Sequence, residues 1–116
     1  MQIIGPAKII KVYIGDSDQW QGKPLYAAIV QRAHDMGMAG ATVLHGLEGF
    51  GATSRIHTAR ILRLAQDLPV VIDIIDKPER IAAFLPILEE MVGEGLITVT
   101  DTEVVHYVAN PVVPAK

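Results

Sequence analysis

The chain has 116 residues, half of them apolar, and a formal net charge of −3. This length is typical of one domain, and the acidic balance argues against bulk binding of nucleic acid. The absence of cysteine excludes disulfides, thiolate metal sites and cysteine nucleophiles, and it fits a cytoplasmic protein. The sequence contains no signal peptide and no apolar run of about 20 residues, so we expect a soluble chain.

The first half of the chain predicts a strand, a helix and a second strand. Residues 8–15 alternate apolar and polar side chains, which is the period of a half-buried strand, and turn residues follow Gly15. Pro24 suits the first turn of a helix, apolar residues follow at helical spacing, and Gly37 can end the helix. Residues 41–47 form the second expected strand.

The middle of the chain is harder to assign. Residues 52–66 have a mixed pattern that fits either a short helix or a mobile loop. Residues 69–75 are almost continuously apolar, which indicates a strand that is buried on both faces. Asp76 and Glu79 have the spacing of a capping box, so we expect Asp76 to cap the second helix.

This second helix contains a residue that conflicts with the pattern. Pro86 lies within its apolar repeat, although a proline inside a helix removes a backbone hydrogen bond. The Gly-Glu-Gly run at 93–95 is expected to end the helix. Two further strands are predicted at 96–100 and 103–108.

The order βαββαβ predicts an α+β fold of the ferredoxin-like type, in which two helices pack on one sheet. We expect a single domain over residues 1–116, with a core at about 8–108 and flexible tails at 1–7 and 109–116. This plan hosts many unrelated activities, so the function must be argued from individual residues.

The segment 49–66 is unusual in an acidic protein, because it contains three arginines and one histidine but no acid. It follows a Gly-Phe-Gly turn, where missing side chains let the backbone approach a ligand. Guanidinium groups, hydroxyls and backbone amides are what an anionic group needs. The alternative is a solvated helix face on which Arg60 and Arg63 point to water.

Several separated motifs resemble the PII signal-transduction family. The Glu-Gly-Phe-Gly run at 48–51, with Ser-Arg-Ile-His-Thr at 54–58 and Leu-Pro at 68–69, is similar to the T-loop region of PII proteins. The likeness is closer to one PII-like branch of uncharacterised small proteins, often encoded near fluoride channels. Further matching runs lie at 13–15, 22–26, 40–44, 70–71, 84–86 and 95–96, so the resemblance extends from about residue 8 to residue 107.

The resemblance implies a homotrimer of ferredoxin-like subunits that bind adenine nucleotides in the clefts between subunits. The Gly-Phe-Gly turn and the residues after it correspond to one wall of each cleft. The run 92–97 resembles the B-loop, which forms the other wall. The residues that we expect to bind the ligand are Gly49, Phe50, Gly51, Ser54, Arg55, His57, Thr58, Gly93, Glu94 and Gly95.

The chain departs from the PII pattern where PII proteins hold phosphates. Leu96 stands at the position of the B-loop lysine, and the C-terminal arginines of PII proteins have no counterpart. The segment after Gly51 is one residue longer, and it lacks the tyrosine that some PII proteins modify. A smaller anion, a nucleoside monophosphate or a cyclic nucleotide would need fewer cations than ATP does.

Other residues give weaker indications of a functional site. None of the four histidines pairs with another at metal-ligand spacing, so no metal site is predicted. The aspartates at 16–18 and 73–76 could form paired carboxylates, although loop aspartates more often bond their own backbone. Trp20 could stack on a ligand, but we favour a lid over the core.

We therefore expect a regulatory trimer, not an enzyme, that senses a small anionic effector and signals through the T-loop-like segment 52–66. An adenine nucleotide is among the candidate effectors, and a membrane channel is among the candidate protein partners; no cofactor is expected. Arg55 is the expected main cation because it is nearest to the Gly-Phe-Gly turn. The alternatives are an interaction subunit without a small ligand, and an enzyme acting on a small phosphorylated compound.

Overall fold

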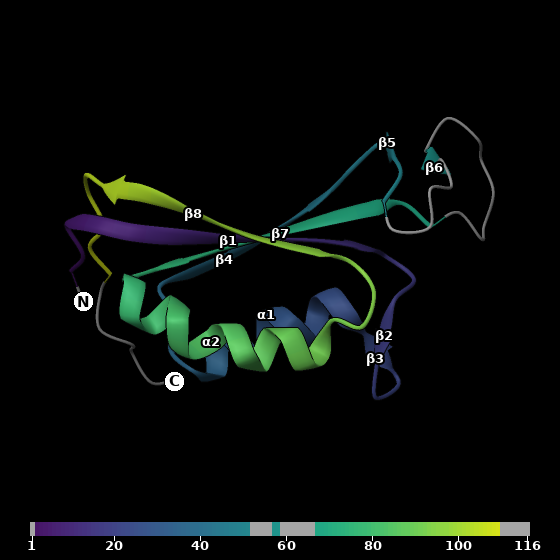
Figure 1. The fold of residues 1–116 in the computed structure, drawn as a ribbon, viewed down its shortest axis with the longest axis horizontal. Coiled ribbons are helices and arrows are strands. Elements are labelled where there is room, and N and C mark those ends of the chain that lie inside the picture. The colour runs from purple at the N-terminus through teal and green to yellow at the C-terminus, as the bar shows by residue number, and fades with distance from the viewer. Residues whose placement is uncertain (1, 52–56, 59–66, 110–116) are drawn as a thin grey trace, which may run out of the picture.

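The computed structural model describes residues 2–51, 57–58 and 67–109, and its centre is a four-stranded antiparallel sheet (Figure 1). The order of the strands across this sheet is β4-β7-β1-β8. These strands are β1 (Gly5–Gly15), β4 (Gly40–His45), β7 (Pro69–Asp76) and β8 (Leu96–Val104).

Two helices and two short hairpins complete the described chain. Helix α1 (Leu25–Asp35) precedes β4, and helix α2 (Pro78–Met91) joins β7 to β8. The resulting order of long elements is βαββαβ, which confirms the predicted α+β, ferredoxin-like fold. The hairpins, which the sequence did not predict, pair β2 (Gln19–Trp20) with β3 (Lys23–Pro24) and β5 (Glu48–Gly49) with β6 (His57–Thr58).

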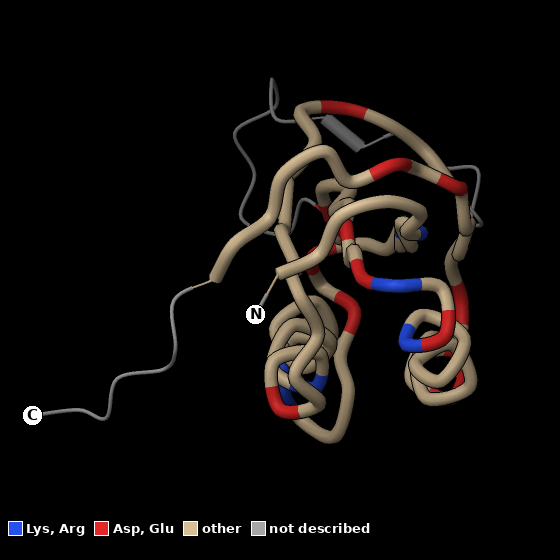
Figure 2. The backbone as a smooth tube through the Cα atoms, turned by 90° about the vertical axis from the view of Figure 1, so that its left-hand side faces the viewer, with Lys and Arg blue, Asp and Glu red and all other residues tan. Residues whose placement is uncertain are grey.

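Both helices lie on one face of the sheet, and Figure 2 views them end-on beneath it. From Ile10 to Ile14 in β1, and along β7, every second side chain is buried on the helix side, as the two-residue period of a strand requires. In α1 the buried residues recur every four positions, which is one stripe of a helix. The core consists of Ile10, Val12, Ile14, Leu25, Ile29, Ala33, Val70, Ile72, Ile74, Ile81, Phe84, Leu88 and Met91.

The opposite face of the sheet has an apolar row near the end where β1 stops, and this row is only partly covered. Leu96, Tyr13, Val71 and Leu44 are successive neighbours across all four strands. Leu44 and Leu96 are more than half exposed, and Tyr13 is 39% exposed. The prediction that the third strand is buried on both faces is therefore wrong for the single chain, because burial in β7 alternates and is complete only on the helix side.

The ends of the sheet also differ from the prediction. β1 begins at Gly5 and not at residue 8, because residues 5–7 pair with the far end of β8. The two predicted strands at 96–100 and 103–108 are one strand as far as Val104. The polar residues in its middle stay in the ladder, where Asp101 lies opposite Lys8 and its Oδ1 accepts a hydrogen bond from Nζ of Lys8 at 2.6 Å.

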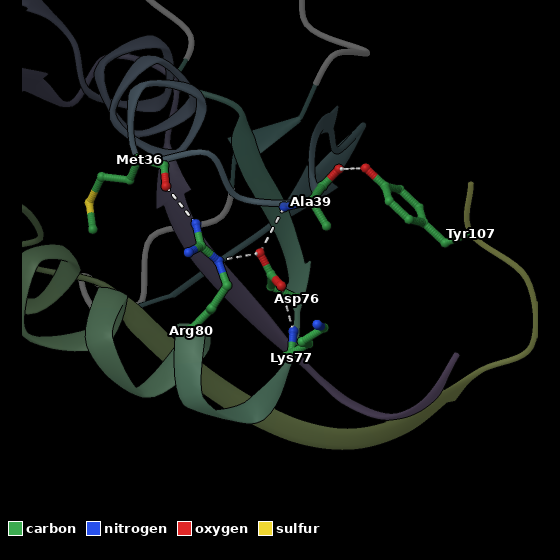
Figure 3. A network of polar contacts seen from close by, with 6 residues as sticks. All are labelled: Met36, Ala39, Asp76, Lys77, Arg80 and Tyr107. Atoms are coloured by element: carbon green, nitrogen blue, oxygen red, sulfur yellow. Dashed lines mark hydrogen bonds and ion pairs between the residues drawn. The ribbon is translucent and has the colours of Figure 1, made fainter. Parts of the chain in front are cut away.

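The predicted cap of the second helix is wrong. Asp76 is buried and makes no cap bond; Lys77 is the N-cap residue, and Pro78 occupies the first turn. Figure 3 shows what Asp76 does: its carboxylate accepts hydrogen bonds from the backbone amides of Ala39 and Lys77 and from Nε of Arg80. The side chain thus ties the end of β7 to the turn before β4.

Pro86 lies inside α2 without ending it. The carbonyl that loses its partner belongs to Ala82, one turn earlier, and both residues are exposed. Water can therefore bond this carbonyl, which explains why the helix tolerates the proline. None of the helices in the described ranges is long and apolar enough to cross a membrane.

Candidate functional site

A pocket of about 480 Å³ opens at one end of the sheet, where β1 ends and β7 begins. The chain reaches this end four times, because the turns after β1, β4 and α2 and the approach to β7 all border it. The residues that line it are Tyr13, Ile14, Gly15, Asp18, Gly46, Glu48, Gly49, Phe50, Gly51, Asp67, Pro69, Val71, Glu94 and Gly95.

Three of the lining glycines lie in close contact with another segment of the chain. A Cβ on Gly15 would lie 2.5 Å from the carboxylate oxygens of Asp67, and a Cβ on Gly46 would lie 2.7 Å from Cγ of Pro69. A Cβ on Gly95 would lie 2.8 Å from the carbonyl oxygen of Tyr13. The separate segments can therefore converge on one pocket because these positions have no side chain.

Two aspartates tie the turn after β1 to the start of β7. The amide of Ser17 donates to Oδ1 of Asp67 at 2.9 Å, and the amide of Asp16 donates to the carbonyl of Leu68 at 2.9 Å. Burial raises the pKa of the Asp16 carboxyl above its ordinary value of 3.8, and a hydrogen bond and charge repulsion from Asp67 raise it further. A backbone hydrogen bond at Leu68 and the charge of His45 act in the opposite direction.

The structure brings five of the ten predicted ligand-binding residues to this pocket. Gly49, Phe50 and Gly51 line it from one side, and Glu94 and Gly95 line it from the other. The predicted Gly-Phe-Gly wall and the turn that resembles the B-loop thus face the same space within one subunit.

The other five predicted residues have different positions. Gly93 belongs to the same turn as Glu94 but does not line the pocket. His57 and Thr58 form β6, whose backbone pairs with β5 beside the pocket. Ser54 and Arg55 lie outside the described residues, as do Arg60 and Arg63.

Sequence reasoning missed several residues that shape the pocket. Asp67 was not singled out because it stands alone before the Leu-Pro pair, and its partners Asp16 and Ser17 are distant in the sequence. Tyr13 and Val71 were predicted as strand residues, and their position on the open face at the pocket edge depends on strand register. The PII-like runs at 13–15, 68–69 and 70–71 include or adjoin these positions, but they did not indicate that the positions border one pocket.

The described wall of the pocket is acidic. Asp18, Glu48, Asp67 and Glu94 contribute carboxylates to it, whereas no lysine, arginine or histidine is among its described residues. The carboxylate of Asp18 is oriented by the amide of Gly15, which donates to Oδ2 at 3.0 Å. Phe50 is 68% exposed and adds an aromatic ring to the wall.

The carboxylate pairs considered from the sequence, between the 16–18 turn and Asp73 or Asp76, do not form among the described residues. Asp73 pairs with Lys11 at 3.3 Å and Asp76 with Arg80 at 3.1 Å, so neither forms the predicted pair with the 16–18 turn. The partner of Asp16 is Asp67. Within the described ranges, no group of three His, Cys, Asp or Glu side chains could hold a metal ion. Trp20 is half-buried and packs against the core, as a lid would.

Comparison with solved structures supports the fold. The chain is similar to CPII, a nitrogen regulatory PII-like protein from Thiomonas intermedia K12 that was solved bound to ADP, AMP and bicarbonate. The TM-score is 0.57 at 20% identity, over 85% of this chain and 88% of that one. A second structure of CPII, bound to ADP and bicarbonate, gives a TM-score of 0.53 at 20% identity, with the same coverage of both chains.

Comparison with curated sequences gives closer relatives. A UPF0166 protein of Aquifex aeolicus (strain VF5) is 38% identical over 101 residues, which cover 85% of this chain and 93% of the relative. A UPF0166 protein of Methanocaldococcus jannaschii is 37% identical over 99 residues, covering 84% and 91%. The family model DUF190, described as Uncharacterized ACR, matches residues 7–104. The chain therefore belongs to the DUF190 family, and its fold is that of PII-like proteins.

Proposed function

We propose that this protein is a PII-like regulator that binds a small effector in the pocket at the end of the sheet, with adenine nucleotides as the first candidates. The observation that carries the proposal is the convergence of Gly49–Gly51 and Glu94–Gly95 on one pocket. Its volume of about 480 Å³ lies within the roughly 300–1,000 Å³ of ordinary ligand sites. CPII, with the same fold, was solved with ADP, AMP and bicarbonate bound.

A ligand in this pocket would contact both ends of the segment 52–66. Gly51 precedes this segment, Asp67 follows it, and both residues line the pocket. Ligand binding at the two anchoring points can therefore change the conformations open to the segment between them. We propose that this coupling is the signal, and that it is read in the cytoplasm by a protein partner, for which the family resemblance suggests a membrane channel.

We also propose that the protein is a homotrimer. Supporting this, the row of Leu44, Val71, Tyr13 and Leu96 leaves apolar surface on the face of the sheet away from the helices. Tyr13 and Val71 also line the pocket, so a neighbouring subunit on this face would border the ligand. Light scattering at micromolar concentration should give three times the chain mass. A monomer at all concentrations would contradict the trimer.

Calorimetric titration with AMP, cyclic AMP, ADP, ATP and bicarbonate tests the ligand proposal. We expect at least one adenine nucleotide to bind with a dissociation constant below about 100 µM, and to raise the melting temperature because it binds only the native state. Phe50→Ala should weaken that binding by about 2- to 10-fold through the lost ring contact. If none of these compounds binds, the interaction subunit without a small ligand becomes the better description.

A further inference from the structure

We propose that the groove between the β2–β3 hairpin and helix α1 docks an acidic segment of a protein partner, in which carboxylates flank an apolar side chain. This groove has a volume of about 370 Å³ and shares no lining residue with the pocket at the end of the sheet. The inference therefore goes beyond the proposed function and does not depend on it.

The β2–β3 hairpin forms one side of the groove and leads directly into α1 (Figure 1). Its turn has two residues, and both have a positive φ, 49° at Gln21 and 80° at Gly22. Gln21 is the one non-glycine residue with a positive φ in the described part of the chain, and turns of this kind favour asparagine, aspartate or glycine there. The turn pairs Trp20 with Lys23, and directly opposite residues have their side chains on the same face, so both line the groove.

Helix α1 forms the other side of the groove. Ala27, Gln31 and Asp35 follow one another at intervals of four residues and are exposed, so they form one stripe of the helix. The helix rises about 12 Å over this stripe, which is the length of roughly four extended residues. The small side chains of Ala27 and Ala28 let another chain come close. An elongated groove of this kind fits a peptide segment better than a compact molecule.

The middle of the groove is apolar. Trp20, Pro24 and Met91 line it together with the two alanines of α1. Met91 belongs to the core and Trp20 packs against it, so the fold itself holds both side chains in place. An apolar side chain of a partner would be removed from water here, which favours docking.

Two cations flank this apolar middle. Lys23 precedes the helix and Arg32 lies in its last turn, and neither forms an ion pair among the described residues. The undescribed residues contain no aspartate or glutamate that could neutralise them. Asp35 also lines the groove, but its Oδ1 accepts a hydrogen bond from Nε2 of Gln31 at 2.8 Å and lies 3.5 Å from Nδ1 of His34. The two cations can therefore pair with carboxylates of a partner.

Trp20 is the only tryptophan in the chain, so its fluorescence reports on the groove. The probe is a displayed library of random 12-residue peptides without tryptophan. Peptides are selected that bind the full-length wild-type protein but not the variant Ala27→Glu. This variant places a larger, negative side chain in the groove, and it should fold normally because Ala27 is exposed and glutamate is a good helix former. We expect the selected peptides to carry an apolar residue between acidic residues, and the most enriched one to change the emission of Trp20.

Lys23→Gln and Arg32→Gln should each weaken binding of that peptide by about 1.5- to 5-fold, because single exposed ion pairs contribute little. The double variant should weaken it by about 2- to 25-fold if the two effects add. Lys77→Gln is the matched control, since Lys77 is also exposed and forms no ion pair among the described residues, but does not line the groove. Titrations followed by the emission of Trp20 measure all four variants.

Three outcomes would overturn the inference. No peptide distinguishes the wild-type protein from Ala27→Glu, or the peptides that do so carry no excess of acidic residues. In the third outcome, Lys77→Gln weakens binding as much as Lys23→Gln and Arg32→Gln do, which means attraction by net charge and not by the groove. None of these results depends on nucleotide binding at the end of the sheet, so the proposed function can fail while this inference holds.

Discussion

The wall of the pocket and the segment that leaves from it have opposite charge. The wall collects carboxylates from turns that are far apart in sequence, among them Asp18, Glu48 and Glu94, and it has no described cation. The segment 49–66 contains three arginines and no acid. A ligand with a neutral part rich in hydrogen-bond donors could bind the carboxylates of the wall, and an anionic part of the same ligand could bind the arginines of the segment. Under the proposed function, recognition of the ligand would be shared between the pocket wall and this segment.

The largest effect is expected on the cationic side of this contrast. Arg55→Ala should weaken binding of an anionic ligand by roughly 10- to 150-fold, because a charge-assisted hydrogen bond to phosphate or carboxylate is worth about 1.5–3 kcal/mol. Calorimetry with AMP measures the loss, and light scattering checks that the assembly is intact. Arg63→Ala is the control and should change affinity little. Equal losses in both variants would mean diffuse attraction by the segment and not a built site.

An intermediate effect is expected from the geometry of the wall. Gly95→Ala places a Cβ 2.8 Å from the carbonyl oxygen of Tyr13 and 3.0 Å from Cγ2 of Ile14. Overpacking of this kind costs about 1–3 kcal/mol, so the urea midpoint should fall and ligand binding should weaken with it. Gly93→Ala is the matched control, because a Cβ there meets no atom within 4 Å. Equal stability of the two variants would show that the turn is not held against β1.

The smallest effect concerns the two aspartates at the base of the segment. Because the pKa of the Asp16 carboxyl is raised in the folded protein, its contribution to stability is full below about 3.8 and is lost as the pH rises through the folded-state pKa. Asp16→Asn cannot ionise and can still donate to Asp67. It should raise the free energy of unfolding at pH 7 by a few tenths of a kcal/mol, up to about 1 kcal/mol.

This gain should shrink as the pH is lowered toward 4, where the wild-type carboxyl also becomes protonated. Urea unfolding of both proteins between pH 4 and pH 8 measures it. A constant difference across this range would show that ionisation of Asp16 does not affect the free energy of unfolding.

The sequence predicted the long elements well, because their signals are local. The alternation at 8–15 and the helical spacing after Pro24 appear as β1 and α1 with small shifts of their ends. Errors occurred where a distant partner decides the outcome. Asp76 has the spacing of a cap, but the amide of Ala39 and the guanidinium of Arg80 draw its carboxylate into the interior. Polar residues near Asp101 looked like a break, yet pairing with β1 keeps them in β8.

The candidate site was predicted only where a motif spans neighbouring residues. The Gly-Phe-Gly run and the Gly-Glu-Gly turn could be singled out in the sequence, and the resemblance to PII proteins paired them. The acidic character of the wall could not be recognised in the sequence, because only the fold brings Asp18, Glu48 and Glu94 to one pocket. The hydrogen-bonded pair of Asp16 and Asp67 has the same origin.

The position of Gly51 and Asp67 on one pocket has a practical consequence. Both residues line the candidate pocket, so a reporter inserted between them would be attached where the proposed ligand binds. Insertions succeed mostly where the chain ends to be joined are exposed and close together. A fluorescent module placed between these residues would turn the scaffold into an optical sensor, in which the colour or brightness of the module reports occupancy of the pocket.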